Sequence, residues 1–148
     1  MNFKDLVNAR QIIIDNYSDP ENKKFLLDKN AVYINQSSES CIDNITVELL
    51  FKDDLIEEAR FEGEGCAISI SSTNIMAKIL KSKTITQAKE IINQYNNMIS
   101  NKICDEKVLE ELIVFSNVYK QPNRIRCSLI GIDGYHKLIK SKNNKEDK

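Results

Sequence analysis

The sequence lacks long apolar runs, an excess of either charge, and any pair of cysteines spaced as CxxC. No run approaches the roughly 20 residues of a spanning helix, and residues 1–5 lack the basic start and apolar middle of a signal peptide, so we expect a cytoplasmic protein. Lys and Arg number 21 against 22 Asp and Glu, for a formal net charge of −1. This balance gives no bulk attraction to nucleic acid or to an anionic membrane, so neither partner is expected.

Length and composition indicate one compact domain. The chain has 148 residues, of which 41% are hydrophobic, and this is enough to bury a single core. Residues 141–148 contain no apolar side chain that could dock on that core. The predicted division is therefore a single domain over residues 1–140 and a polar, disordered tail over residues 141–148.

Three β-strands are predicted in the first half of the chain, over residues 31–34, 45–49 and 55–61. The second of these alternates strictly between apolar and polar side chains, and a tight turn at residues 52–54 leads into the third. In the third strand, Leu55, Ala59 and Phe61 are expected to share one face. Together the strands predict an antiparallel meander.

Apolar residues at helical spacing predict helices on both sides of these strands. The predicted helices cover residues 3–17, 69–80 and 85–95, a short segment at 108–115, and a last helix that begins at Pro122. Gly131 and Gly134 weaken the prediction of the last helix. Since the strands precede most of the helices, we expect an α+β fold, with a three-stranded antiparallel sheet and helices packed on one face.

Four cysteines are present, namely Cys41, Cys66, Cys104 and Cys127. In a reducing compartment they are poor candidates for stable disulfides, so metal binding or thiol chemistry is favoured. Cys41 precedes the second predicted strand and Cys66 follows the third. The start of one strand of a hairpin lies beside the end of the next, so these two thiols should approach each other.

Residues around these thiols favour a metal site. Asp43 comes two residues after Cys41 and can supply an oxygen ligand. Gly63 and Gly65 allow a sharp turn before Cys66, and a helix N-terminus after it would favour the thiolate. Together with Cys127 this donor set suits tetrahedral zinc. A buried cysteine is also commonly a small hydrophobe, so the spacing alone leaves both interpretations open.

Other polar residues are interpreted as structural. Cys104 lies in a polar segment and is expected to be an incidental thiol, and His136, the single histidine, to be a surface residue. No acid–base partner is evident around the hydroxyl residues Ser69, Ser71, Ser72 and Thr73, so close helix packing is the default interpretation. Paired carboxylates beside the predicted turn are expected to be solvated, which argues against an acid–base hydrolase.

The segment FEGEGCAIS at residues 61–69 closely resembles the U-type iron–sulfur cluster assembly proteins, the family of IscU, SufU and the N-terminal domain of NifU. Three further segments are similar to the family. The family's opening helix and loop correspond to Arg10-Gln11 with Asp15, Tyr17, Pro20 and Asn22. Its Cys-Gly-Asp corresponds to Cys41-Ile42-Asp43, and its third cysteine segment to Arg124-Ile125-Arg126-Cys127. The resemblance runs from about Asn8 to Leu138 and implies the SufE/NifU-like fold.

Two features resemble the SufU branch in particular. The interval from Cys66 to Cys127 is long, which is similar to the insertion of SufU proteins, and Arg126 stands where IscU proteins carry a histidine. One feature departs from the family, because Ile42 replaces the glycine of Cys-Gly-Asp and a β-branched residue resists positive φ.

The resemblance implies a zinc-dependent sulfur carrier or sulfurtransferase. It implies that Cys41, Asp43, Cys66 and Cys127 bind zinc, that Cys41 also accepts persulfide sulfur, and that Arg124 orients the site. The donor would be a SufS-type cysteine desulfurase with its own pyridoxal phosphate, and the recipients would be downstream iron–sulfur assembly proteins. One alternative is a scaffold on which an iron–sulfur cluster is assembled, and another is a non-catalytic, zinc-stabilised interaction domain.

Overall fold

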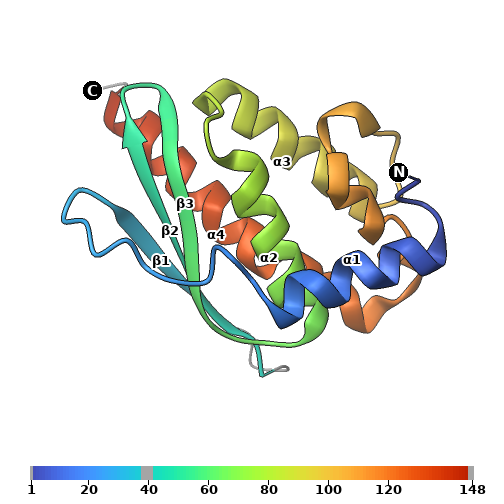
Figure 1. The fold of residues 1–148 in the computed structure, drawn as a ribbon. Coiled ribbons are helices and arrows are strands. Elements are labelled where there is room, and N and C mark those ends of the chain that lie inside the picture. The colour runs from blue at the N-terminus through green and yellow to red at the C-terminus, as the bar shows by residue number, and fades with distance from the viewer. Residues whose placement is uncertain (1, 38–41, 147–148) are drawn as a thin grey trace.

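The computed structural model describes residues 2–37 and 42–146 of the chain (Figure 1). The strands are β1 (Val32–Ser37), β2 (Asn44–Lys52) and β3 (Leu55–Glu64). The α-helices are α1 (Leu6–Ser18), α2 (Ala67–Leu80), α3 (Ile85–Ile99) and α4 (Pro122–Glu146). Three short 3₁₀ helices, η1 (Glu106–Val108), η2 (Glu110–Phe115) and η3 (Val118–Lys120), lie between α3 and α4.

The strands form one antiparallel sheet in the order β1-β2-β3. On the central strand, the alternating residues Ile45, Val47 and Leu49 are fully buried, as their period of two predicts. Asn44 pairs with Glu64, so the start of β2 lies beside the end of β3. This pairing sets the position of the candidate site, because Asp43 directly precedes one strand and Cys66 closely follows the other.

The apolar face of β3 differs from the prediction at its first residues. The β2–β3 register shifts between Leu50 and Phe51, where Leu50 pairs with Glu58 and Phe51 with Ile56. This irregularity changes the alternation, so Ile56 joins Ala59 on the buried face. The placement of Leu55 on that face was wrong, since its side chain is 38% exposed.

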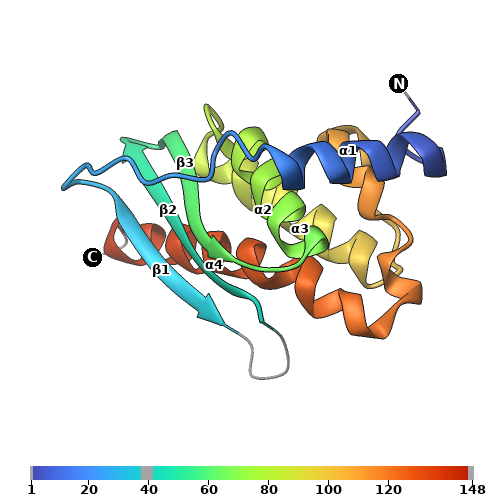
Figure 2. The ribbon, with the colours of Figure 1, turned by 60° about the horizontal axis from the view of Figure 1, so that its bottom comes forward.

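The helices cover one face of the sheet, which confirms the predicted α+β architecture. Helix α2 contacts β3, helix α4 contacts β1 and β2, and the two helices contact each other. Figure 2 shows α4 running beneath the sheet, with α2 between it and α1. Helix α1 packs on α2 and η2, so α2 is enclosed on several sides.

Small side chains allow α2 to occupy this central position. All residues from Ser69 to Ala77 are buried, and the small polar ones bond to carbonyls of the preceding turn. Thr73 Oγ1, for example, donates to the Ser69 carbonyl oxygen at 2.7 Å. Gly131 of α4 faces this part of α2, and a Cβ atom there would overlap Thr73 Oγ1. The glycine in α4 is therefore explained by a close helix crossing.

The predicted short helix at residues 108–115 is replaced by the 3₁₀ helices η1, η2 and η3. Four of the five buried residues of this region, Leu109, Leu112, Phe115 and Val118, recur every three positions, and Val114 is the fifth. Side chains three apart lie above one another in a 3₁₀ helix, so this period favours 3₁₀ over α geometry.

Helix α4 continues to Glu146, so residues 141–146 are helical here and the predicted domain boundary at residue 140 does not coincide with a helix end. The predicted disorder of the tail stays a prediction. Within residues 2–37 and 42–146, every helix is too short or too polar to cross a membrane.

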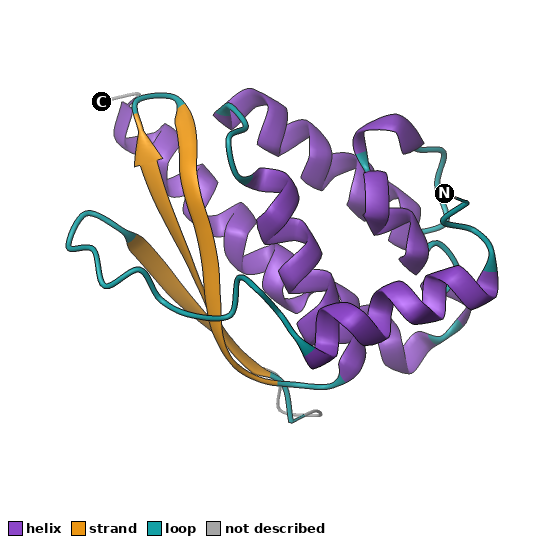
Figure 3. Cartoon of the chain, viewed as in Figure 1, coloured by secondary structure: helices purple, strands orange, loops and turns teal. Residues whose placement is uncertain are grey.

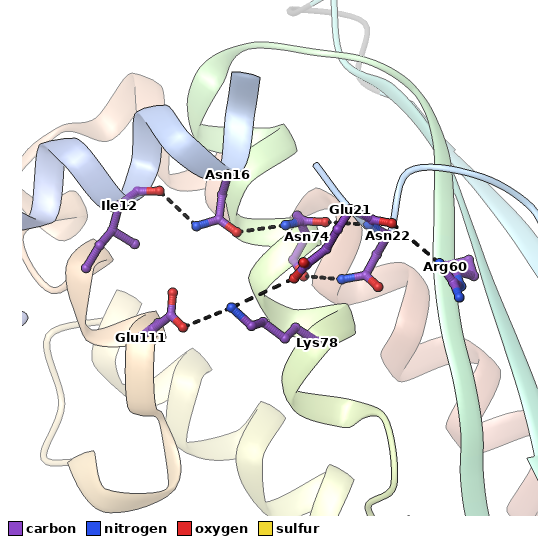
Figure 4. Close-up of polar contacts among 8 residues, drawn as sticks. All are labelled: Ile12, Asn16, Glu21, Asn22, Arg60, Asn74, Lys78 and Glu111. Atoms are coloured by element: carbon purple, nitrogen blue, oxygen red, sulfur yellow. Dashed lines mark hydrogen bonds and ion pairs between the residues drawn. The ribbon is translucent and has the colours of Figure 1, made fainter. Parts of the chain in front are cut away.

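The connection between α1 and β1 (residues 19–31) contains neither helix nor strand, and asparagines attach its first part to α2 (Figures 3 and 4). Asn22 N–H donates to Asn74 Oδ1 at 3.0 Å, and Asn22 Nδ2 donates to the Asn74 carbonyl oxygen at 3.3 Å. Asn74 Nδ2 in turn donates to Asn16 Oδ1 at 2.7 Å. Asn16 therefore contributes to helix packing.

Candidate metal centre

Three potential ligands meet where β2 begins and where α2 begins. Asp43 directly precedes β2, Cys66 directly precedes α2, and Cys127 is the sixth residue of α4. One carboxylate oxygen and the two sulfur atoms all lie within 4.8 Å of one another. The β2–β3 pairing brings the first two residues together, and the packing of α4 on α2 adds the third.

Cys66 is the N-cap residue of α2, which confirms the predicted helix start beside this thiol. Its Sγ accepts the backbone N–H of Ser69 at 3.5 Å, and the side chain is partly exposed. A sulfur at this position lies at the positive end of the helix dipole.

The two carboxylate oxygens of Asp43 have different surroundings. Oδ1 accepts the backbone N–H of Cys66 at 3.0 Å and the hydroxyl of Ser69 at 2.9 Å. Oδ2 is buried and has no hydrogen-bond partner among the described residues. A buried carboxylate oxygen without a partner is energetically unfavourable, and a bound cation would remove that cost. The residues present therefore fit a metal ion.

Two glycines shape the backbone at this corner. Gly63 has φ of +132°, a region that favours glycine, and a Cβ atom there would overlap the Asn44 carbonyl oxygen of β2. At Gly65 a Cβ atom would overlap Ser69 Oγ and would lie 2.8 Å from Asp43 Oδ1. The absence of a side chain at Gly65 thus leaves room for the bond between Ser69 and Asp43.

Cys127 is the most deeply buried thiol of the cluster, with 4% of its surface exposed. Burial raises the pKa of this thiol well above its usual range, and the nearby Asp43 and Cys66 raise it further. Metals bind the thiolate, so a metal ion that binds here displaces a proton.

The structure tests only some of the predicted site. Cys41, the predicted fourth ligand and sulfur acceptor, lies outside the described residues. Arg124 is exposed in the first turn of α4, one turn before Cys127, and its role stays a prediction. Cys104 and His136 do not belong to the metal-ligand cluster found among the described residues.

Ile42, which stands where the family carries glycine, has a side chain that is 78% exposed and so does not pack in the core. The effect of this replacement on the loop before Asp43 stays a prediction.

The hydrogen bond from Ser69 to Asp43 was not predicted from the sequence, because Ser69 was interpreted as a packing residue. One signal could have identified it. Ser69 lies three residues after Cys66, and the side chain at this position of a helix commonly reaches back toward the N-cap. Its acceptor, Asp43, directly precedes β2 and could not be predicted without the position of that strand.

Comparison with known proteins gives a consistent result. The family model described as NifU-like N terminal domain matches residues 8–141, which include Asp43, Cys66 and Cys127. The zinc-dependent sulfurtransferase SufU of Bacillus subtilis (strain 168) is 33% identical over 122 residues, covering 82% of each chain. The iron–sulfur cluster assembly scaffold protein IscU of Thermotoga maritima is 27% identical over 120 residues, covering 81% of this chain and 84% of that protein.

Solved structures share the fold. A crystal structure of a SUF-system protein from Fervidobacterium islandicum AW-1, assigned to the iron–sulfur cluster assembly scaffolds, is 32% identical. Its TM-score is 0.76 over 84% of this chain and 90% of that chain. The N-terminal NifU-like protein of Brucella abortus has a TM-score of 0.82 over 95% of this chain and 99% of that chain. At 18% identity, this second likeness shows the fold alone.

Proposed function

The chain belongs to the NifU-like N-terminal domain family, and from this premise we propose that it is a zinc-dependent sulfur carrier for iron–sulfur cluster assembly. Its donor would be a SufS-type cysteine desulfurase that holds pyridoxal phosphate. The similarity to the zinc-dependent sulfurtransferase SufU supports this choice.

The observation that carries the proposal is the unpartnered Asp43 Oδ2 beside two thiols. Two sulfur donors and one carboxylate oxygen from three separate segments suit zinc, which accepts both atom types in tetrahedral sites. Cys41, two residues before Asp43 in the sequence, is the proposed fourth ligand. Zinc bound there would stabilise thiolates at neutral pH.

The proposed transfer is a thiol exchange on Cys41. Its thiolate attacks the terminal sulfur of the persulfide on the desulfurase, and the sulfur–sulfur bond of that persulfide breaks. Cys41 then carries the persulfide, and the desulfurase cysteine leaves as a thiolate, so charge and sulfur are conserved. Arg124, exposed in the first turn of α4, is the proposed orienting charge.

The second candidate is a scaffold on which a cluster is assembled by the same residues, and the similarity to IscU proteins favours it. Metal analysis and a visible spectrum of protein purified without air separate the two candidates. One equivalent of zinc and no visible absorption is the result expected for the carrier. Iron with visible absorption would favour the scaffold, and a metal-free protein that binds neither would contradict both.

The sulfur step is tested by desulfurase turnover with cysteine as substrate. The Cys41→Ser variant should fold but fail to accelerate the turnover, because a hydroxyl cannot carry the persulfide. Cys104→Ser is the matched control and should stimulate like the parent, since Cys104 lies outside the described cluster. Full stimulation by Cys41→Ser would remove Cys41 as acceptor, and loss of stimulation by Cys104→Ser would identify the other thiol.

A further inference from the structure

We propose that Ser69 is a positioning residue for the metal centre, whose hydroxyl holds Asp43 so that only one carboxylate oxygen binds the metal ion. This inference rests on the proposed function, because it concerns the same site.

Ser69 is placed for this task by helix geometry. It lies in the first turn of α2, three residues after the N-cap residue Cys66, and its side chain is fully buried. Its hydroxyl oxygen lies 2.9 Å from Asp43 Oδ1, and its backbone N–H points at Cys66 Sγ at 3.5 Å. One residue thus contacts two of the three described ligands, through its side chain and its backbone.

The hydroxyl has a second acceptor within reach, the Cys66 carbonyl oxygen at 3.1 Å. Serines in helices commonly donate to a carbonyl of the preceding turn, so this contact is the ordinary alternative. A hydroxyl has one proton, and a carboxylate is a stronger acceptor than a neutral carbonyl. The shorter distance to Asp43 Oδ1 and the negative charge there both favour the carboxylate.

Gly65 gives independent support for a specific contact. A Cβ atom at residue 65 would overlap Ser69 Oγ and would lie 2.8 Å from Asp43 Oδ1, so it would occupy the space of this hydrogen bond. The φ angle of Gly65 lies outside the range that favours glycine, so the backbone conformation does not by itself explain the residue. Space for the bond between Ser69 and Asp43 does explain it.

The consequence concerns how Asp43 binds a metal. Asp43 Oδ1 accepts hydrogen bonds from the Cys66 N–H and the Ser69 hydroxyl, which fix the carboxylate. Its other oxygen, Oδ2, is buried and has no hydrogen-bond partner among the described residues. Without the hydroxyl, Oδ1 keeps one donor and the carboxylate can rotate. Outer-shell donors of this kind typically change metal affinity by about 10- to 100-fold.

The test compares Ser69→Ala with Ser71→Ala. Both residues are fully buried serines of α2, but the Ser71 hydroxyl donates to the Ile68 carbonyl oxygen at 3.4 Å, a contact within the helix. Zinc affinity is measured by competition with a chromophoric chelator, and Co²⁺ is used as a spectroscopic substitute. Ser69→Ala should weaken zinc binding about 10-fold or more and alter the Co²⁺ ligand-field bands, whereas Ser71→Ala should do neither.

A double-mutant cycle separates positioning from general stability. In an Asp43→Ala background, Ser69→Ala should cause no further loss of zinc affinity, because the group it positions is absent. Equal zinc affinities of the Ser69→Ala and Ser71→Ala variants would overturn the proposal, and so would losses that add in the Asp43→Ala background. If Ser69→Ala fails to fold without metal, Gly65→Ala replaces it, since a Cβ there should disturb the same bond.

The parent protein distinguishes this inference from the proposed function. A parent that binds neither Zn²⁺ nor Co²⁺ would remove the metal centre itself. A parent that binds both, with affinity unchanged by Ser69→Ala and by Gly65→Ala, would leave the metal centre in place and exclude only the role of Ser69.

Discussion

Asp43 and Cys66 are neighbours in the candidate site but differ as potential ligands. The Asp43 carboxylate is almost fully buried and receives two hydrogen bonds on one oxygen, whereas Cys66 presents a partly exposed sulfur at a helix N-terminus. Zinc binds thiolate sulfur more strongly than a carboxylate oxygen in a mixed site. The two residues should therefore contribute unequally to metal retention.

We predict that Asp43→Ala retains more zinc than Cys66→Ala. Removing the carboxylate leaves the thiolate ligands in place, and water can occupy the open position, whereas removing Cys66 deletes a soft ligand. Zinc content after gel filtration and the dissociation constant from chelator competition measure the difference. Comparable zinc loss in both variants would contradict this ranking.

At the residue scale, the sequence indicated that Asp43, Cys66 and Cys127 lie together, but it did not indicate the hydrogen bonds around them. Asp43, Cys66 and Cys127 could be proposed as ligands because donor atoms suited to zinc are few and the predicted hairpin places two of them together. The hydrogen bond from Ser69 to Asp43 could not be predicted, because it depends on the position of the first turn of α2 relative to the start of β2. The residue pattern of the helix and that of the strand each indicate local structure only.

Among the elements, the crossing of α2 and α4 determines where Cys127 lies. Gly131 is one turn after Cys127, and a Cβ atom at residue 131 would lie within 2.8 Å of Thr73 Cβ and would overlap Thr73 Oγ1. The Thr73 side chain that this Cβ would meet is short and β-branched, so it has little freedom to move away. The two helices therefore approach closely at the level of the metal-ligand cluster.

We predict that Gly131→Ala lowers the free energy of unfolding by about 1–3 kcal/mol, as overpacking of a core does, and also weakens zinc binding. The stability loss should be smaller in a Thr73→Ala background, where part of the colliding side chain is gone. Urea denaturation of the four proteins measures this coupling. A Gly131→Ala variant as stable as its parent would show that the helices separate without cost.

The asparagine contacts attach the connection before β1 to α2. Asn74 is buried, and its side chain accepts from Asn22 N–H and donates to Asn16 Oδ1 (Figure 4). Its neighbour on the next turn, Lys78, forms ion pairs with Glu21 at 3.8 Å and Glu111 at 3.1 Å. These pairs are largely exposed and contribute little, so the buried asparagine is the main polar connection.

We predict that Asn74→Ala lowers the free energy of unfolding by about 2 kcal/mol, because it leaves the Asn22 N–H without its acceptor inside the protein. The matched control is Asn93→Ala, an exposed position in the interior of α3, which should change stability by less than about 0.5 kcal/mol. Thermal and urea unfolding measure both. Equal effects of the two substitutions would show that water replaces the Asn74 contacts.

The elements themselves were largely predictable, and the exceptions have physical reasons. Strict alternation over residues 45–49 and helical spacing over residues 85–95 are strong local signals, and both elements are present. The irregular pairing near Phe51 reverses the alternation of β3 at its start, which no single-strand pattern indicates. The 3₁₀ region was mistaken for an α-helix because three- and four-residue spacings overlap in short segments.

On the scale of the whole molecule, the site lies where the sheet and the helix layer meet. The candidate ligands come from the residue before β2, the residue before α2 and the second turn of α4, so they belong to segments far apart in the sequence. The core holds these elements together through apolar contacts and through buried tyrosines such as Tyr135, whose hydroxyl donates to the Arg60 carbonyl oxygen at 2.8 Å. A metal would add a direct connection among all three.

We predict that removing zinc destabilises the entire domain, because a ligand that binds only the folded state stabilises it by mass action. Free zinc at about 100 times its dissociation constant contributes about 2.7 kcal/mol, which corresponds to a rise in Tm of roughly 5–11 °C for a chain of this size. The experiment compares the dialysed, metal-free protein with the same sample reloaded with zinc. Cys66→Ala is the control, and its Tm should respond much less to zinc, since one thiolate of the cluster is missing. If the parent melts at the same temperature with and without zinc, the three ligand segments are held by the apolar core alone, and the metal has no part in stabilising the fold.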